Sequence, residues 1–329
     1  APGGRYLLTF DNHNSVNGIR EYARARGAAI TYAPVNPPEL RIDTEKLEGF
    51  LDQAQPGAHN LFAYPAQSNF SGVQHSLDWI ERAQQKGWDV LLDAAAFVPT
   101  NRLDLGAVHP DFVCLSFYKM FGYPTGVGAL LARRSALAKL HRPWFAGGTI
   151  TVASVQGDRY FLHLGAEGFE DGTLNYLTLP AVEIGLRHIA GMGYDMIHMR
   201  AACLAGWLLE QLSGLRHSNG MPVVKVYGPL ETEMRGGTIT MNFFDPRGHF
   251  VDHLRVEERA NRKNISIRTG CFCNPGGGEL ALGLSAEELS TCFALKPRME
   301  YTDFRRCIDD KSTGAVRILM DLREPIEGM

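Results

Sequence analysis

Short apolar runs alternate with helical stretches in the first part of the chain, and this alternation restricts the fold more than any other feature. The apolar runs, which are typical of buried strands, lie at 6–10, 28–32, 60–64 and 88–92. The stretches with a helical pattern lie between them at 16–26, 44–53 and 74–86. Because strands separated by helices of this length pair in parallel, the pattern predicts an α/β fold with a mostly parallel, doubly wound sheet.

A long helical stretch at 179–215, interrupted near Gly191 and Gly193, separates this pattern from a second one. Beyond it, short apolar runs and shorter helical stretches predict a smaller α+β unit. We therefore predict a large domain at 1–185 and a small C-terminal domain at 186–329. Since residues 6–10 already have the pattern of a core strand, we expect the N-terminal part of the large domain to lie upstream of this chain.

Composition and charge argue against several classes of function. A chain of 329 residues with 45% hydrophobic residues can bury a full core. The formal net charge of -3 gives no basic surface for nucleic acid or for an anionic membrane. No apolar stretch reaches the roughly 18 residues needed to span a bilayer, and no signal peptide opens the chain. The six cysteines are sparse for this length, which favours reduced thiols and a cytoplasmic location.

A lysine follows the apolar run at 112–116, at the start of a turn rich in glycine and proline. A lysine beyond the end of a buried strand can hold an aldehyde cofactor as a Schiff base, and Lys119 is the candidate. The apolar run at 88–92 leads to Asp93, 26 residues earlier. Because ligands bind beyond the carboxyl ends of parallel strands, Asp93 and Lys119 are expected in one crevice. Pyridoxal phosphate requires both groups, since a carboxylate beside its ring nitrogen keeps the ring protonated.

Four segments together resemble a known family. They read LLDAAAFVPT, SFYKMFGYPTGVGALL, FEDGT and RTGCFCNPG, and they occur in this order over nearly the whole chain. The chain is thereby similar to the cysteine desulfurase domain of molybdenum cofactor sulfurases, which are class V members of the aminotransferase superfamily. The resemblance implies the pyridoxal-phosphate fold type I, in which the large domain binds the cofactor. It also implies that L-cysteine is the substrate, that alanine and a cysteine persulfide are the products, and that a sulfur acceptor exists, whose identity stays open.

The resemblance assigns further residues to the cofactor. His13 is expected to stack on the cofactor ring, and Asn69 to hydrogen-bond its phenolic oxygen. Ser116 and Tyr118 match positions that bind the phosphate, although cysteine desulfurases commonly have histidine at the position of Tyr118. Thr173 matches a threonine that reaches the phosphate of the neighbouring subunit, so the resemblance implies a homodimer with shared sites. A glycine and threonine loop that holds the phosphate in the family has no counterpart here. Taken alone, the histidine, the asparagine and the threonine are equally compatible with turn positions.

Cys271 and Cys273 lie one residue apart, ahead of three glycines at 276–278. This composition predicts an exposed, mobile thiol that swings toward a bound substrate. The resemblance places Cys273 at the persulfide-forming cysteine, with Cys271 as the alternative nucleophile or a partner thiol. A zinc site is the competing interpretation, but a second ligand pair cannot be assembled convincingly from Cys292 and Cys307. We therefore expect no metal.

Recognition of an amino acid requires a cation for its α-carboxylate. Arg317 matches the family's C-terminal arginine for that role, and Arg268 is the second candidate, although it can equally position the cysteine loop. The resemblance thus implies that Lys119 removes the α-proton while the thiolate of Cys273 attacks the substrate sulfur.

Two alternatives to this function stay open. One is another reaction of a class V enzyme, such as a transamination or a lyase reaction, and the other is a non-catalytic fragment of this fold, which the missing phosphate loop favours.

Overall fold

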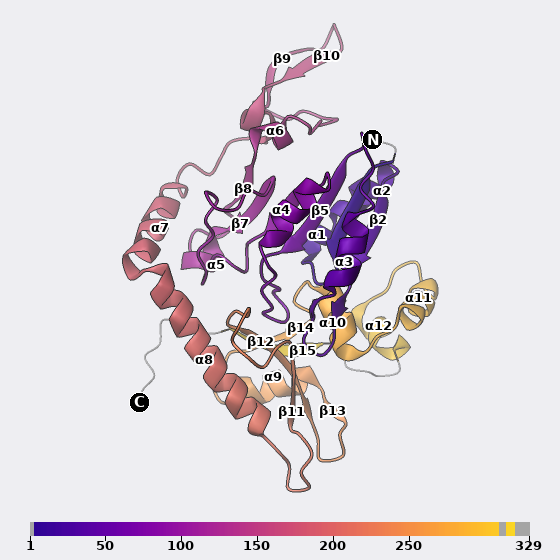
Figure 1. The fold of residues 1–329 in the computed structure, drawn as a ribbon, viewed down its shortest axis with the longest axis vertical. Helices are drawn as coiled ribbons and strands as arrows, with labels where there is room; N and C mark the ends of the chain where they lie inside the picture. Colours follow the sequence, from indigo (N-terminus) through magenta and orange to yellow (C-terminus); the bar gives the residue numbers. More distant parts are fainter. Residues whose placement is uncertain (1–2, 309–313, 320–329) are drawn as a thin grey trace.

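The predicted strands of the large domain form one sheet (Figure 1). Among residues 3–308 and 314–319, which the computed structural model describes, this sheet has six strands in the order β2-β1-β5-β6-β7-β8. They are β1 (Arg5–Thr9), β2 (Ala29–Ala33), β5 (Asn60–Pro65), β6 (Asp89–Asp93), β7 (Phe112–Ser116) and β8 (Gly128–Ala132). Neighbours from β2 to β7 pair in parallel, and β8 runs antiparallel to β7. The prediction of a mostly parallel α/β sheet is confirmed.

Helices connect these strands, and some begin or end away from the predicted residues. They are α1 (Asn14–Asn17), α2 (Ile19–Ala25), α3 (Thr44–Leu51), α4 (Asp78–Gln85) and α5 (Phe117–Phe121), while β3 (Val35–Asn36) pairs with β4 (Arg41–Ile42). The single helix predicted at 16–26 is divided at Gly18, a residue of low helix propensity. The helix predicted from residue 74 begins only at Asp78, because Gln74 forms a bridge with Gln67 and its main-chain N–H donates to Met234.

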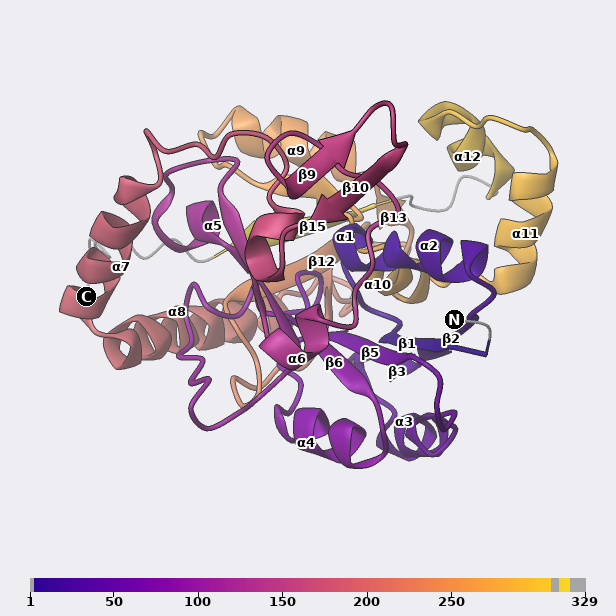
Figure 2. The ribbon, with the colours of Figure 1, turned by 90° about the horizontal axis from the view of Figure 1, so that it is seen from above.

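The chain after β8 leaves the sheet and forms a projecting arm (Figures 1 and 2). It contains α6 (Arg134–Leu137), β9 (Ile150–Ser154), β10 (Arg159–Leu162) and the 3₁₀ helix η1 (Gly165–Phe169). The strands β9 and β10 form an antiparallel hairpin. Val155, in the turn of the hairpin, is 99% exposed, and Leu164, just beyond β10, is 95% exposed. The predicted elements do not include this hairpin.

Two helices, α7 (Pro180–Met192) and α8 (Tyr194–Gly214), connect the two larger sheets among the described residues. They meet at Gly193, whose φ of 85° is favourable only for glycine. The predicted break near residues 191 and 193 is therefore confirmed. The predicted domain boundary after residue 185 falls inside α7, and the division into two domains stays a prediction.

The C-terminal residues form a second sheet, in the order β11-β12-β15-β14, with β13 beside β12. Its strands are β11 (Val224–Tyr227), β12 (Thr238–Phe244), β13 (Phe250–Val251), β14 (Arg268–Gly270) and β15 (Ala315–Leu319). The helices of this part are α9 (His253–Asn261), α10 (Pro275–Leu282), α11 (Ala286–Ala294) and α12 (Tyr301–Cys307). The sequence pattern predicts the first of these helices at 249–262, but it begins at His253, because Phe250 and Val251 before it pair with β12.

A disulfide between Cys292 and Cys307 joins α11 to α12, with the two Cα atoms 5.7 Å apart. The expectation of reduced thiols is therefore wrong for this pair. The connection between the two helices returns the chain so that the sulfurs meet, and the spacing of 15 residues along the sequence does not reveal that proximity. The free cysteines are Cys114, Cys203, Cys271 and Cys273.

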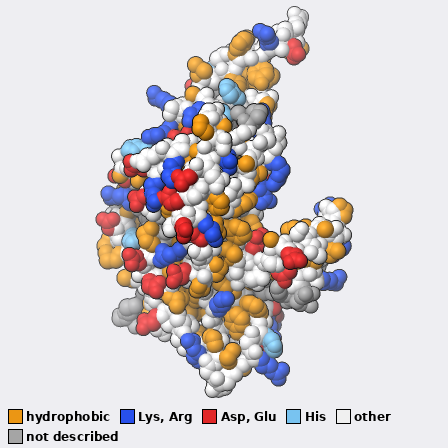
Figure 3. Space-filling model, turned by 45° about the vertical axis from the view of Figure 1, so that its right-hand side comes forward, with side chains coloured by type: hydrophobic (Ala, Val, Ile, Leu, Met, Phe, Trp, Pro, Cys, Tyr) orange, Lys and Arg blue, Asp and Glu red, His pale blue; other side chains and the backbone are white. Residues whose placement is uncertain are grey.

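Acidic and basic side chains are intermixed on the face shown in Figure 3, in keeping with the small net charge of -3. Among the described helices, none has the length and apolar character that a membrane span requires.

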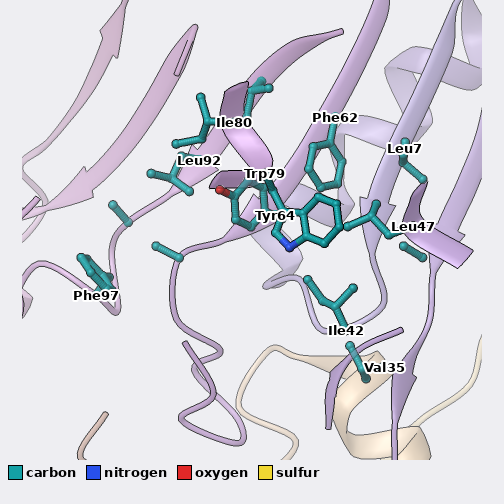
Figure 4. Packing of buried hydrophobic residues seen from close by; sticks show 14 of the residues in the cluster. Leu7, Val35, Ile42, Leu47, Phe62, Tyr64, Trp79, Ile80, Leu92 and Phe97 are labelled. Atoms are coloured by element: carbon teal, nitrogen blue, oxygen red, sulfur yellow. The ribbon is translucent and has the colours of Figure 1, made fainter. Parts of the chain in front are cut away.

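The main core packs α3 and α4 against the central sheet (Figure 4). Its buried side chains include Leu7, Leu47, Phe62, Tyr64, Trp79, Ile80 and Leu92. Each large apolar side chain that is fully buried contributes about 1.5–3 kcal/mol relative to exposure. This packing fixes β5 and β6, and with them the carboxyl ends of the strands, where the predicted site residues lie.

Candidate active site

Asp93 and Lys119 lie at the carboxyl ends of the neighbouring parallel strands β6 and β7. Asp93, the last residue of β6, is buried and lies opposite Cys114 of β7. Its Oδ1 accepts a hydrogen bond of 3.0 Å from the main-chain N–H of Ala95. Burial lowers the pKa of the Lys119 amine, and the negative charges of Asp93 and Cys273 offset only part of this effect. The lysine and the aspartate therefore lie at the same edge of the sheet and interact electrostatically, while a shared crevice stays a prediction.

His13 lies at the start of α1 and faces the same charges. Its Nδ1 accepts a hydrogen bond of 3.2 Å from the main-chain N–H of Ser15, which caps the helix and favours a proton on Nε2. Burial lowers the pKa of His13, and the positive charges of Lys119 and Arg317 lower it further against the opposing effect of Asp93. The imidazole is therefore neutral near pH 7.

Ser116 and Tyr118 flank Lys119 along the chain. Ser116 precedes α5, but its hydroxyl makes no capping hydrogen bond with that helix, so the hydroxyl is left for a ligand. Tyr118 is exposed, with 44% of its surface open to solvent. Thr173 is also exposed, on the segment between η1 and α7. Contact between Thr173 and a second copy of the chain stays a prediction.

The two cysteines lie on a tight turn whose backbone is strained. Phe272 and Cys273 have φ values of 58° and 56°, in the left-handed region that costs a residue with a side chain about 1–2 kcal/mol. The main-chain N–H of Asn14 donates to the carbonyl of Cys273 over 2.7 Å. Cys271 and Cys273 are both exposed. Strain of this kind persists where surrounding contacts enforce it, and it is common at functional sites.

The predicted mobility of this turn is not supported, because the three glycines that follow it belong to α10. A Cβ atom on Gly276 would lie 1.9 Å from the main-chain oxygen of Phe10, so this position requires glycine for close packing. The glycines therefore allow α10 to pack closely against the residues that follow β1. They do not make the segment that contains Cys271 and Cys273 mobile.

Asn274 stabilises this turn through hydrogen bonds made by its buried side chain, and sequence reasoning did not identify this residue. Its side chain is 0% exposed. The Nδ2 group donates to the main-chain oxygen of Asp11 over 2.7 Å and to Oδ1 of Asn69 over 3.0 Å. Its Oδ1 accepts from the N–H of Gly277 over 3.0 Å, which caps α10. The sequence signal is an asparagine directly before proline, a combination typical of a helix start.

Arg317 projects from β15, paired in register with the exposed Arg268 of β14. Its Nη1 donates to the main-chain oxygen of Asn69 over 2.9 Å, and its guanidinium lies 4.4 Å from the centre of the Phe272 ring. The Nε atom is buried without a hydrogen-bond partner, and no carboxylate among residues 3–308 and 314–319 pairs with this arginine. Burial, together with the charge of Arg268, lowers the pKa of Arg317 to about 10, while Cys273 raises it. Such a cation is suited to an anionic ligand.

A buried pair, Asp11 and His75, supports this site, and sequence reasoning did not identify it either. His75 Nε2 lies 2.9 Å from Asp11 Oδ2, and both side chains are 2% exposed. Burial alone would raise the pKa of Asp11, but the charge and hydrogen bond of His75 lower it overall. Since the main chain of Asp11 also binds Asn274, this pair helps to position the cysteine turn.

These residues fit pyridoxal phosphate in the chemistry of their donors. A lysine with a lowered pKa, a buried carboxylate and a neutral imidazole interact electrostatically at one edge of the sheet, and the serine before the lysine makes no capping hydrogen bond. Among the described residues, no group of three or more His, Cys, Asp or Glu side chains is arranged to hold a metal ion.

Known proteins share both the sequence and the fold. Molybdenum cofactor sulfurase of Homo sapiens is 37% identical over 332 residues, which cover 96% of this chain and 37% of that protein. The Arabidopsis thaliana molybdenum cofactor sulfurase is 36% identical over 352 residues, with coverages of 95% and 42%. The chain thus spans about two fifths of the length of these relatives.

Among solved structures, the apo cysteine desulfurase of Thermococcus onnurineus NA1 superposes with a TM-score of 0.73 and 21% identity, over 99% of this chain and 70% of that one. The cysteine desulfurase CsdA of Escherichia coli superposes with a TM-score of 0.73 and 18% identity, over 97% and 67%. At these identities the two structures establish the fold alone, which is that of the predicted class. The aminotransferase class-V family matches residues 1–291, and the chain therefore belongs to that family.

Proposed function

We propose that this chain is a pyridoxal-phosphate-dependent L-cysteine desulfurase of the molybdenum cofactor sulfurase type. The observation that carries this proposal is the convergence of Lys119, Cys273 and Arg317, whose charges act on one another although the residues are far apart in sequence. An amine, a thiol and a guanidinium without a carboxylate partner are the groups that proton removal, sulfur capture and carboxylate binding require. The names of the relatives in Homo sapiens and Arabidopsis thaliana support the same function.

The cofactor, when bound, supplies an electron sink for the electron pair left at the substrate α-carbon. Asp93, as a buried carboxylate, would keep the ring nitrogen of the cofactor protonated. Lys119 accepts the α-proton at Nζ, and its lowered pKa favours the neutral amine that this step requires. His13 would supply a neutral imidazole to the cofactor, and Ser116 and Tyr118 would supply hydroxyl groups for its phosphate.

The sulfur step is carried out by Cys273 and Arg317. Arg317 binds the α-carboxylate, and Arg268, its neighbour on β14, is the second candidate cation. The thiolate of Cys273 attacks the sulfur of L-cysteine, the Cβ–S bond breaks, and its electron pair and a proton go to Cβ. The products, L-alanine and a persulfide on the protein, contain all atoms of L-cysteine and the thiol. This step therefore needs no external oxidant or reductant.

Incubation of the full chain with pyridoxal phosphate and L-cysteine tests this function. We expect equal amounts of alanine and protein persulfide from the wild type, and neither product from Lys119→Ala. Asp93→Asn should keep the cofactor, which borohydride then attaches to Lys119, but turnover should be nearly abolished. A wild type that is labelled by borohydride and forms no alanine would indicate another class V reaction. A folded wild type that is not labelled would indicate a non-catalytic fragment.

A homodimer with a shared active site is part of the proposal. Thr173 is exposed, as its predicted contact with a second copy requires, and Val155 and Leu164 of the projecting arm are almost fully exposed. Mixing Thr173→Ala with Lys119→Ala should give heterodimers with one intact composite site and partial activity. Heterodimers without activity would count against the shared site.

The sulfur acceptor and the cellular location also belong to the proposal. We propose that an acceptor of unassigned identity receives the sulfur of Cys273. The free thiols of Cys271 and Cys273 favour the cytoplasm, whereas the disulfide between Cys292 and Cys307 is the observation against it. Cell fractionation with an antibody against the chain tests the location.

A further inference from the structure

The residue between the two cysteines, Phe272, lies directly against the proposed carboxylate ligand. The guanidinium carbon of Arg317 is 4.4 Å from the centre of the Phe272 ring. Nη1 of Arg317 donates to the main-chain oxygen of Asn69, and Nε has no hydrogen-bond partner. Since no carboxylate of the described residues pairs with the guanidinium, its charge is stabilised by the aromatic face of Phe272 and by the main-chain oxygen of Asn69.

Phe272 is itself held in place from two directions. Its ring is 7% exposed and packs against Phe70, with 5.8 Å between the ring centres. Its main-chain oxygen accepts a hydrogen bond of 2.8 Å from Nδ2 of Asn69. Asn69 therefore bonds to both Phe272 and Arg317, and the three residues form a closed set of contacts. The ring has a defined position under the guanidinium because these contacts and the strained φ of 58° leave it little freedom.

We propose that Phe272 positions Arg317 for the α-carboxylate of the substrate, so that the cysteine turn also sets substrate affinity. The inference rests on the proposed function. An aromatic face attracts a guanidinium without occupying its N–H groups, whereas an aspartate or glutamate would occupy the groups that a substrate carboxylate needs. The ring therefore fixes the orientation of Arg317 and leaves donors free for a bidentate carboxylate. Because Phe272 and Cys273 are consecutive, displacement of the thiol also displaces the surface that supports the arginine.

Steady-state kinetics with L-cysteine test this role. Phe272→Leu keeps an apolar side chain but removes the aromatic face, and we expect KM to rise about tenfold, equivalent to about 1.4 kcal/mol, with kcat within twofold of wild type. Phe272→Tyr restores the face and should return KM to within twofold of wild type. As a matched control, Phe62→Leu removes a ring from the core beneath the sheet, and it should lower stability without raising KM. An unchanged KM in Phe272→Leu, or an equal rise in Phe272→Tyr, would overturn the proposal.

A second readout does not depend on turnover. Phenylglyoxal modifies accessible arginines, and mass spectrometry measures the modified fraction of Arg317 with and without saturating L-alanine in protein loaded with pyridoxal phosphate. L-alanine should protect Arg317 at least fivefold in the wild type and in Phe272→Tyr, and less than twofold in Phe272→Leu. Equal protection in all three proteins, or none in the wild type, contradicts the role of Phe272. A wild type that shows this pattern but forms no alanine from L-cysteine would remove the proposed function and retain the positioning role.

Discussion

Asn69 and Phe272 are joined by a hydrogen bond of 2.8 Å across 203 residues of sequence, with the side-chain amide of Asn69 donating to the carbonyl of Phe272. The same asparagine accepts from Asn274 through Oδ1 and from Arg317 through its main-chain oxygen. The loop after β5, which contains Asn69, therefore connects the six-stranded sheet to the turn that contains the two cysteines and to β15. The bond predicted from Asn69 to the cofactor's phenolic oxygen stays a prediction, and the second hydrogen of Nδ2 is the donor left for it.

Replacement of Asn274 by alanine should destabilise the fold and the site together. The change removes the cap of α10 and leaves the acceptors on Asp11 and Asn69 without their donor. A lost cap costs about 1 kcal/mol and the buried acceptor on Asp11 without its partner about 1–3 kcal/mol, so we expect the free energy of unfolding to fall by at least about 2–4 kcal/mol, since the part-buried acceptor on Asn69 adds to this loss. Urea unfolding measures this value. Asn219→Ala, which removes an exposed bond to Pro246, is the control and should cost less than about 1 kcal/mol. An equal loss in both variants would contradict the buried role of Asn274.

The persulfide is expected on Cys273 and not on Cys271. The charge of Cys273 acts on both Lys119 and Arg317, the groups proposed to take the α-proton and to bind the α-carboxylate, so this thiol lies beside the proposed substrate position. Cys273→Ser should release no sulfide from L-cysteine in the presence of a dithiol, whereas Cys271→Ser should retain more than half of the wild-type rate. Because both thiols are exposed, solvent access does not distinguish them. Mass spectrometry that finds the added sulfur on Cys271 would reverse the assignment.

Stability should fall as the pH decreases below the ordinary pKa of histidine, partly because of His13. Burial and the charge of Lys119 lower the pKa of His13 from 6.5 in the folded chain. Below pH 6.5 the unfolded chain therefore binds a proton that the folded chain does not, and unfolding is favoured until the pH falls through the folded pKa. His13→Asn keeps a capping side chain for α1 and should lose less stability than the wild type between pH 8 and pH ~5. Thermal unfolding at both pH values gives this difference, and equal losses would show that His13 does not contribute.

The disulfide can be tested by counting thiols. Alkylation of the denatured protein without reductant should modify four of the six cysteines, and all six after reduction. Cys307→Ser should lower the free energy of unfolding by about 3 kcal/mol, because the bond closes a loop of 15 residues. Cys203→Ser changes an exposed free cysteine and serves as the control, with no effect expected. Modification of six cysteines before reduction would show that Cys292 and Cys307 are not bonded.

The strands and the chemistry at their ends could be read from the sequence, because both depend on local patterns. Apolar runs between helical stretches predict parallel strands, and β6 and β7 lie at the predicted positions to within one residue at each end. Asp93 and Lys119 could be placed at the same edge of the sheet because parallel strands present their carboxyl ends there. The antiparallel β8 and the hairpin of β9 and β10 could not be derived in this way, since no periodicity specifies strand direction.

The sequence by itself determined which chemical groups this protein has, and the tertiary structure decided how they are held. The three glycines of α10 read as a flexible segment, but Gly276 is required by a contact with Phe10, a residue from the other end of the chain. The hydrogen bond from Asn274 to Asp11, the stacking of Arg317 on Phe272 and the bond between Cys292 and Cys307 all join residues that are distant in the sequence or on different helices. Such contacts arise only when the sheets and helices pack, because packing sets the distances between side chains that no local pattern contains.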